Sequence, residues 1–240
     1  MHASSLRAAK IQENYREILR QVASAAQATG RNPGDIRVVA VTKYVGVADA
    51  MALVDGGCLD LGESRPQSIW QKAAAAPSTV RWHLIGHLQR NKVRRTLPQI
   101  HLLHSLDSMR LAVDFAMEVS SLDMSIGVLL EVQIAQDASK TGMAPEDAAA
   151  WLDRYVTEDQ LRNRVRLQGL MGMSSLGADA SQVRREFASL RSWMEIWNQR
   201  YGLEMSELSM GMSQDFEAAI AEGSTLVRIG SRLFEGLPDA

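Results

Sequence analysis

One lysine stands at the end of an apolar run that otherwise has the pattern of a buried strand. The stretch "RVVAVTKYVG" places Val39, Val41 and Lys43 on one strand face, because side chains alternate with a period of two. If the valines point into a barrel, the amine of Lys43 points into its mouth. Partial burial would lower the pKa of this amine from about 10.4, and such an amine can form a Schiff base with a carbonyl compound. A lysine reaching for solvent is the alternative, and Lys43 taken alone favours it.

Two later segments have the composition of a phosphate site. "SMGMSQD" and "RIGSRLF" each place glycine and serine where a helix is expected to begin, and helix N-termini favour anions. Gly211 and Gly230 allow a close backbone approach, while Ser213 and Ser231 add hydroxyl donors. Ordinary helix capping by Ser213 is the alternative, but it explains only one of the two loops. Phosphate beside an inward amine points to pyridoxal phosphate, with Met212 as a filler of the core or pocket.

Arg228 is a charged residue inside the last apolar run, "LVRIG". A charge inside a barrel strand needs a partner. An ion pair with Glu63 or Glu131 would make Arg228 purely structural. Arg228 would alternatively face the ring nitrogen of the cofactor, where a cationic guanidinium disfavours protonation of the ring and weakens it as an electron sink.

Two further polar residues follow the second and third apolar runs. Ser64 is a candidate cap for the helix that comes next. His83 lies in "WHLIGHLQRNK" and is a candidate cofactor-binding residue, although a single histidine is more often a hydrogen-bonded core residue than a base. The basic residues around Arg90 form either a solvated helix face or a partner contact. The histidines and carboxylates lack metal-ligand spacing such as His-Glu-x-x-His, so no metal is expected.

Short apolar runs alternate with helical segments along the chain. Strands are expected at residues 36–42, 59–62, 80–86, 101–106, 125–134, 165–173, 208–210 and 226–230. Helices are expected at residues 47–57, 65–76, 88–97, 108–121 (capped by Asp107), 145–156, 181–201 and 215–223. This alternation predicts an α/β protein with a single (β/α)8 barrel, while an open doubly wound sheet lacks its glycine-rich turn. An extra N-terminal helix is indicated by the spacing of Ile11, Tyr15, Ile18 and Val22.

Composition narrows the class of protein. The 240 residues suit one barrel domain, residues 1–240. The 26 basic and 28 acidic residues give a net charge of −2, which offers no reason to expect a nucleic acid or an anionic membrane as partner. The single cysteine, Cys58, is expected to be buried, and it fits a reducing, cytoplasmic location. Neither a signal peptide nor a membrane span is expected.

Together these segments resemble the YggS/PLPBP-like family of pyridoxal phosphate homeostasis proteins. The resemblance rests on the order of "VAVTK", "LGES", "WHLIGHLQRNK", "SKTG", "GLMGM" and "LSMGMSQDFEAAIAEGSTLVRIGSRLFEG", and it spans residues 38–234. It implies a barrel of the alanine racemase N-terminal type. It also implies that Lys43 holds pyridoxal phosphate as an internal aldimine, with the phosphate bound at Ser213 and at Arg228–Ser231.

The chain departs from the family pattern at a few positions. Family members commonly read Gly-Glu-Asn-Tyr where this chain has Ser64 and Arg65 in the last two places. That Asn commonly lies near the cofactor, so the resemblance puts Ser64 in its place and leaves the contact in question. Gln133 replaces a commoner Asn, and Tyr44 stands where a smaller or basic residue is usual.

The resemblance implies a cofactor carrier or regulator of vitamin B6 pools, without robust catalytic activity. Its expected partners are pyridoxal phosphate and pyridoxal phosphate-dependent apo-enzymes, and it is expected to be a monomer or weak dimer. An amino-acid racemase related to alanine racemase is the alternative. Racemases of that fold take their second catalytic base from a C-terminal β-domain. No such domain follows strand eight before Ala240, so weak or no racemase activity is expected. A lysine aldolase that uses no cofactor is a third alternative. It would be colourless, whereas an internal aldimine absorbs visible light.

Overall fold

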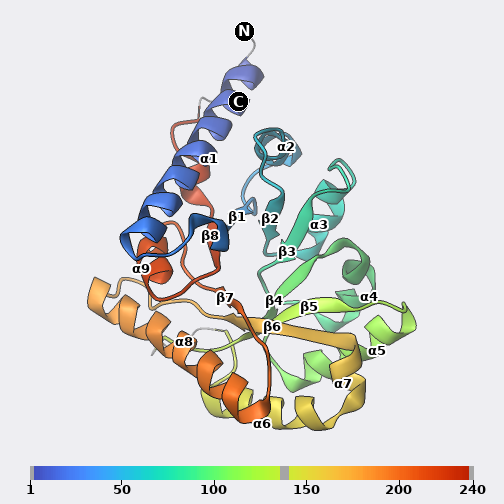
Figure 1. Cartoon of the computed structure of the whole chain (residues 1–240). Helices are drawn as coiled ribbons and strands as arrows, with labels where there is room; N and C mark the ends of the chain where they lie inside the picture. The colour runs from blue at the N-terminus through green and yellow to red at the C-terminus, as the bar shows by residue number, and fades with distance from the viewer. Residues whose placement is uncertain (1–2, 136–140, 238–240) are drawn as a thin grey trace.

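The computed structural model describes residues 3–135 and 141–237, and eight parallel strands close into a barrel in chain order (Figure 1). The strands are β1 (Arg37–Val41), β2 (Asp60–Glu63), β3 (Arg81–Leu84), β4 (Leu102–Leu106), β5 (Ile126–Glu131), β6 (Val165–Met171), β7 (Glu207–Ser209) and β8 (Leu226–Ile229). β8 pairs with β1 and completes the closure. The predicted (β/α)8 barrel is confirmed. Of the "SKTG" motif, Ser139 and Lys140 lie outside the described residues.

Helices cover the outside of the barrel. They are α1 (Ala3–Ala28), α2 (Val47–Asp55), α3 (Pro66–Ala73), α4 (Val93–Thr96), α5 (Met109–Ser121), α6 (Pro145–Thr157), α7 (Asp159–Arg164), α8 (Ala180–Tyr201) and α9 (Phe216–Ala221). Short 3-10 turns form η1 (Pro33–Asp35), η2 (Arg90–Lys92), η3 (Leu97–Gln99) and η4 (Ser231–Phe234). The extra helix α1 packs against α2, α9 and η4 (Figure 1). The residues that predicted it are buried, namely Ile11, Tyr15, Ile18 and Val22.

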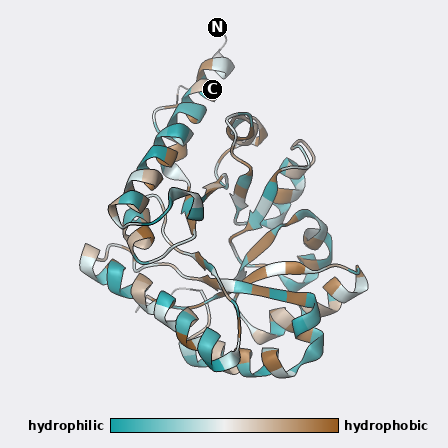
Figure 2. Ribbon diagram, in the orientation of Figure 1, coloured by the Kyte–Doolittle hydropathy of each residue, from teal (hydrophilic) through white to brown (hydrophobic). Residues whose placement is uncertain are grey.

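The apolar side chains form two separate cores. The larger core lies between the strands and the helices, whose solvent-facing sides are largely hydrophilic (Figure 2). The smaller core lies inside the barrel and consists of Val39, Leu102, Leu129, Met171 and Leu226. Buried polar side chains share the barrel interior with this small core, and they matter for the site described below.

The helix predicted at residues 88–97 is wrong as a continuous element. Its place is taken by η2, α4 and η3. The segment is strongly basic and has no acidic residues to form stabilising pairs within one helix. Arg90 instead pairs with Asp114, and Arg94 pairs with Glu118, both on the neighbouring helix α5. These ion pairs tie the segment to α5.

Two predicted helix caps are also wrong. Helix α5 is capped by Ser108, whose Oγ accepts from the amide of Leu111 at 3.3 Å. Asp107 contacts Nδ1 of His87 at 2.8 Å instead, so its carboxylate is directed across to the loop after β3. Helix α3 has Arg65 rather than Ser64 at its N-cap position.

Gly211, in the loop between β7 and α9, lies at φ 91° and is tightly packed. A Cβ there would lie 2.5 Å from Cβ of Ala219 and 2.9 Å from Cα of Phe216. Gly211→Ala should therefore lower the free energy of unfolding by about 2–4 kcal/mol in urea titrations, through backbone strain and overpacking together. Gly177→Ala is the matched control, because Gly177 has φ 74° but a Cβ added there would meet no atom of the described residues within 4 Å beyond its chain neighbours. It should lose only about 1 kcal/mol. Equal losses would contradict the packing argument.

Candidate functional site

Lys43 lies in the turn after β1, at the carboxyl end of the barrel. Val39 is buried in the interior core, and Val41 lies against Gly62, as the alternation predicted. Lys43 itself is exposed, and its Nζ lies 5.0 Å from the ring centroid of Tyr44. The side chain therefore has the exposure that Lys43 taken alone favoured, and not the partial burial that would lower the pKa of its amine. The amine is instead open to any ligand that enters from this face.

A buried ion pair fixes the turn that carries Lys43. Lys72 of α3 contacts Oε1 of Glu63 at 2.5 Å and donates to the carbonyl oxygen of Thr42 at 2.7 Å. The hydroxyl of Thr42 donates to the same Glu63 oxygen at 2.6 Å. Thr42, Glu63 and Lys72 are all buried. The residue directly before Lys43 is thus held by its backbone and by its side chain.

The two loops predicted to bind phosphate meet in space. The amide of Gly230 donates to Oγ of Ser213 at 3.2 Å, and Arg232 donates to the carbonyl oxygen of Ser213 at 3.4 Å. A Cβ on Gly230 would lie 3.5 Å from Cβ of Val41, so this loop borders the end of β1. The structure therefore brings Lys43, Ser213 and Gly230 to one end of the barrel.

Several details of these loops correct the sequence-based expectations. Ser213 does not cap α9, because Asp215 is the N-cap residue and its Oδ1 accepts from the amide of Met212 at 2.6 Å. Met212 is 39% exposed and is not a core filler. Gly211 is required by its close contact with α9. Ser231 is exposed at the start of η4, where its hydroxyl can reach a ligand.

Arg228 is 5% exposed and points into the barrel. Its Nη1 donates to the carbonyl oxygen of Ser209 at 2.7 Å and to the hydroxyl at 2.6 Å, and its Nη2 donates to the carbonyl oxygen of Gly172 at 3.1 Å. Burial lowers the pKa of Arg228 to about 10, opposed by nearby carboxylates, so the side chain stays cationic at neutral pH. A guanidinium carries five N–H donors, which leaves donors for a ligand after these three contacts.

The ion pair considered for Arg228 is not formed among the described residues. Glu63 pairs with Lys72 between the barrel and α3. Glu131 is buried, and it accepts from the hydroxyl of Thr141 at 2.5 Å. Burial raises the pKa of Glu131, and the charge of Arg228 acts in the opposite direction. Arg228 is therefore held by neutral oxygens and not by a carboxylate.

Ser64 lies on a groove of about 650 Å³ between the loops that follow β2 and β3. Arg65, His87 and Lys92 also line this groove. A Cβ on Gly86 would lie 2.5 Å from the carbonyl oxygen of Ser64, so only glycine lets these two loops approach so closely. No hydrogen bond among the described residues joins Ser64 to the lysine or to the phosphate loops. Its contact with a cofactor stays a prediction.

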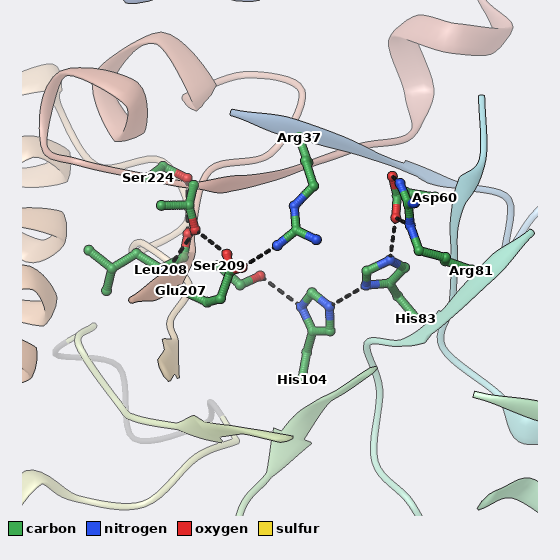
Figure 3. Close-up of polar contacts among 10 residues, drawn as sticks. Arg37, Asp60, Arg81, His83, His104, Glu207, Leu208, Ser209 and Ser224 are labelled. Atoms are coloured by element: carbon green, nitrogen blue, oxygen red, sulfur yellow. Dashed lines mark hydrogen bonds and ion pairs between the residues drawn. The ribbon is translucent and has the colours of Figure 1, made fainter. Parts of the chain in front are cut away.

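His83 is fully buried and belongs to the barrel interior (Figure 3). Its Nε2 lies 2.9 Å from Oδ1 of Asp60, and its Nδ1 lies 2.8 Å from Nε2 of His104. Both ring nitrogens are thus committed to protein partners. We therefore correct the assignment of His83 as a cofactor-binding residue, because no ring nitrogen is left for a direct contact.

The buried histidines should make the protein sensitive to mild acid. Burial lowers the pKa of His83 and lowers that of His104 further. Below a pH of about 6.5, the histidine pKa of the unfolded chain, these histidines bind protons in the unfolded state but stay neutral in the folded state. Stability therefore falls as pH falls. Each histidine should contribute a slope of up to about 1.4 kcal/mol per pH unit in this window.

Urea unfolding at a series of pH values checks this slope, and His104→Gln should make it shallower. Asp60 affects stability at lower pH than the histidines do. Burial alone would raise its pKa, but hydrogen bonds from Arg81 and His83 outweigh burial and hold the pKa below its usual range. Its stabilisation is lost only below about pH 3.9. A flat profile above this value would contradict the assignment of neutral, buried rings.

Sequence reasoning missed four residues that are linked to the site by hydrogen bonds. Asp60, His104 and Ser209 lie inside the barrel, where local sequence gives no signal of their partners. Arg232 is the fourth, and its guanidinium contacts the carbonyl of Ser213. Its position in "RIGSRLF", one residue after Ser231, could have identified it as a charge near the expected phosphate.

The fold and the site define a barrel of the alanine racemase N-terminal type. Residues 7–238 match the family model described as alanine racemase, N-terminal domain. A pyridoxal phosphate homeostasis protein of Pseudomonas aeruginosa is 36% identical over 225 residues, which cover 93% of this chain and 94% of that protein. The chain therefore belongs to the family of pyridoxal phosphate homeostasis proteins.

Solved structures agree with this assignment. An unknown protein from Bifidobacterium adolescentis aligns with a TM-score of 0.88 and 33% identity, covering 95% of this chain and 96% of that chain. PipY of Synechococcus elongatus, solved with pyridoxal phosphate bound, aligns with a TM-score of 0.77 and 31% identity, covering 89% of this chain and 99% of that chain.

The described ranges, 3–135 and 141–237, contain no group of three or more His, Cys, Asp or Glu side chains arranged to hold a metal ion. No helix within them combines the length and the apolar character needed to cross a bilayer.

Proposed function

We propose that the protein binds pyridoxal phosphate at the carboxyl end of its barrel and serves to maintain the supply of this cofactor. One observation carries the proposal: the exposed amine of Lys43, the joined Ser213 and Gly230 loops and the buried Arg228 lie on the adjacent strands β1, β7 and β8 or on the loops that follow them. The names of the relatives and the ligand of PipY support it.

Each side chain has a role that its chemistry allows. Pyridoxal phosphate supplies an aldehyde that reacts with amines and an aromatic ring that withdraws electrons. The accessible amine of Lys43 would hold the aldehyde carbon covalently. The hydroxyls of Ser213 and Ser231, with the backbone at Gly230, would donate to the phosphate, and Arg232 adds a positive charge beside them.

Arg228 favours holding the cofactor over turning over a substrate. Its remaining N–H donors would face the ring nitrogen. A guanidinium that stays cationic there disfavours a second positive charge on the ring, so the ring withdraws electrons weakly. We therefore propose a carrier that retains pyridoxal phosphate and passes it to apo-enzymes, rather than a catalyst.

Borohydride reduction followed by peptide mapping tests the binding site. The protein loaded with pyridoxal phosphate should carry one pyridoxyl group, on the peptide that contains Lys43. A pyridoxyl group on another lysine, or none, would overturn the proposal. The matched control is the same treatment without borohydride, which should leave the Lys43 peptide unmodified.

An amino-acid racemase is the second candidate, since the family model that matches this chain is that of alanine racemase. Racemisation requires a second base opposite the lysine. We propose that this activity is weak or absent, because Arg228 weakens the ring as an electron sink. Circular dichroism of purified, loaded protein with L-alanine and other amino acids checks this, and turnover equal to that of a dedicated racemase would sink the carrier proposal.

The phosphate loops give a separate prediction. Ser213→Ala combined with Ser231→Ala removes two hydroxyl donors, each of which contributes roughly 1.5–3 kcal/mol when bonded to a charged group. Cofactor should bind at least about 100-fold more weakly, measured as the fraction retained after dialysis. Ser206→Ala is a suitable control, because Ser206 is exposed before β7, at the opposite end of that strand. Unchanged retention in the double variant would contradict the phosphate role.

We further propose that the protein works in a reducing cytosol as a monomer or weak dimer. The free thiol of Cys58 supports the first part, since it is buried and burial raises its pKa to about 11. Such a thiol is protected from oxidation but has no disulfide role. Cell fractionation and analytical ultracentrifugation test the two parts, and a membrane fraction or a tight oligomer would refute them.

A further inference from the structure

Five polar side chains form a continuous chain of hydrogen bonds across the barrel interior. The first three contacts run from Oδ1 of Asp60 to Nε2 of His83 (2.9 Å), from Nδ1 of His83 to Nε2 of His104 (2.8 Å), and from Nδ1 of His104 to Oγ of Ser209 (2.8 Å), as Figure 3 shows. Nη1 of Arg228 then donates to the same Oγ at 2.6 Å. The five residues come from β2, β3, β4, β7 and β8, and each is less than 9% exposed.

The two ends of this chain fix its direction. Asp60 is a carboxylate and can only accept, so Nε2 of His83 carries the hydrogen. A neutral ring has one N–H, so Nδ1 of His83 accepts from Nε2–H of His104. By the same argument, Nδ1 of His104 accepts from the hydroxyl of Ser209. The oxygen of Ser209 then offers only lone pairs to Arg228, which can only donate.

The opposite direction of hydrogen donation is excluded by the contacts at the two ends of the hydrogen-bond chain. If each ring carried its hydrogen on Nδ1, Nε2 of His83 would present a lone pair to the carboxylate of Asp60. At the other end, Ser209 would receive a hydrogen from His104 and turn its own toward the guanidinium of Arg228. Both contacts would be repulsive in a buried, low-dielectric interior.

Arg81 anchors the chain at the opposite end from Arg228. Its Nε donates to Oδ1 of Asp60 at 2.7 Å, and its Nη2 donates to Oδ2 at 2.5 Å. This bidentate geometry keeps Asp60 ionised and oriented. The acceptor that sets the direction of the chain is therefore itself held in place.

We propose that Asp60, His83, His104 and Ser209 are positioning residues that hold the guanidinium of Arg228 in a single orientation toward the ligand. Arg228 has no carboxylate partner among the described residues, so the lone pairs of Ser209, kept available by the hydrogen bonds behind them, define where its donors point. The inference rests on the proposed function for the identity of the ligand. The direction of the hydrogen-bond chain from Ser209 to Asp60 is a property of the protein without ligand.

A pair of variants separates this role from simple packing. His104→Gln keeps one N–H donor for His83 and one carbonyl acceptor for Ser209, because an amide presents both groups from one carbon. His104→Leu keeps a buried apolar volume but removes both groups. A structural role would make the two variants differ in stability only, whereas a positioning role also makes them differ in how the bound ligand absorbs light.

The first measurement uses the protein without ligand. Long-range 1H–15N correlation spectra at neutral pH should show His83 and His104 neutral with the hydrogen on Nε2. His104→Gln should keep this tautomer at His83. A charged ring, or a hydrogen on Nδ1 of either ring, would overturn the inference.

The second measurement titrates each variant with pyridoxal phosphate and follows its visible absorption. His104→Leu should shift the absorption maximum and raise the dissociation constant about tenfold, while His104→Gln stays within about twofold of the parent. An unshifted spectrum in His104→Leu would overturn the positioning role. If His104→Leu does not fold, Ser209→Ala takes its place with the same expectations. No binding by the parent, with the expected tautomers, would refute the proposed function and the role toward the ligand but confirm the direction of the chain.

Discussion

Lys43→Met should abolish covalent retention of pyridoxal phosphate and raise its dissociation constant by about 100-fold, or ~2.7 kcal/mol. The amine of Lys43 is exposed in the turn after β1 and lies at the same end of the barrel as the Ser213 and Gly230 loops. Methionine keeps the length and much of the volume of the side chain but has no nucleophile. The measurements are visible absorption and the pyridoxyl adduct after borohydride reduction.

The fold should not suffer in Lys43→Met, because the replaced side chain is exposed and makes no ion pair among the described residues. Its unfolding free energy should therefore stay within about 0.5 kcal/mol of the parent. Lys10→Met is the matched control, since Lys10 lies on the outer helix α1, where it pairs with Glu13, and should leave both the adduct and the affinity unchanged. Full retention of the visible band in Lys43→Met would remove Lys43 from the site.

Lys72→Met should cost about 3–5 kcal/mol of unfolding free energy, because it leaves the carboxylate of Glu63 buried without its counter-charge. The side chains of Lys72 and Glu63 are 5% and 0% exposed. Oε2 of Glu63 has no hydrogen-bond partner among the described residues, and the neutral hydroxyl of Thr42, which donates to Oε1, cannot replace the lost positive charge. Chemical denaturation measures the change.

The double variant Lys72→Met with Glu63→Gln should recover part of this loss, since the buried charge is then removed together with its partner. Both variants lose the donor to the carbonyl oxygen of Thr42. Both should therefore bind pyridoxal phosphate more weakly than the parent, even where stability recovers. If the double variant is no more stable than Lys72→Met, the cost does not come from an unpaired charge.

Local sequence was a good guide to the barrel and to the edge where the site lies. The barrel follows from apolar runs that alternate with helical segments, because parallel strands need helical crossovers. Strand ends are also local, so Lys43, Ser213 and Arg228 could be assigned to the carboxyl ends of their strands. The helix predicted at residues 88–97 is replaced by η2, α4 and η3, in a basic segment with no acidic residue to form pairs within one helix, and its arginines pair with α5 instead.

The sequence by itself thus determined the eight-stranded barrel, the lysine at its mouth and the two loops beside it. Only the tertiary structure decided which charges pair, that Lys43 is exposed, and that His83 belongs to an interior chain ending at Arg228. The physical reason is distance along the sequence. His104 and Ser209 are 105 residues apart, and Arg228 and Gly172 are 56 apart, so their contacts depend on strand register around the closed barrel. No local propensity encodes that register.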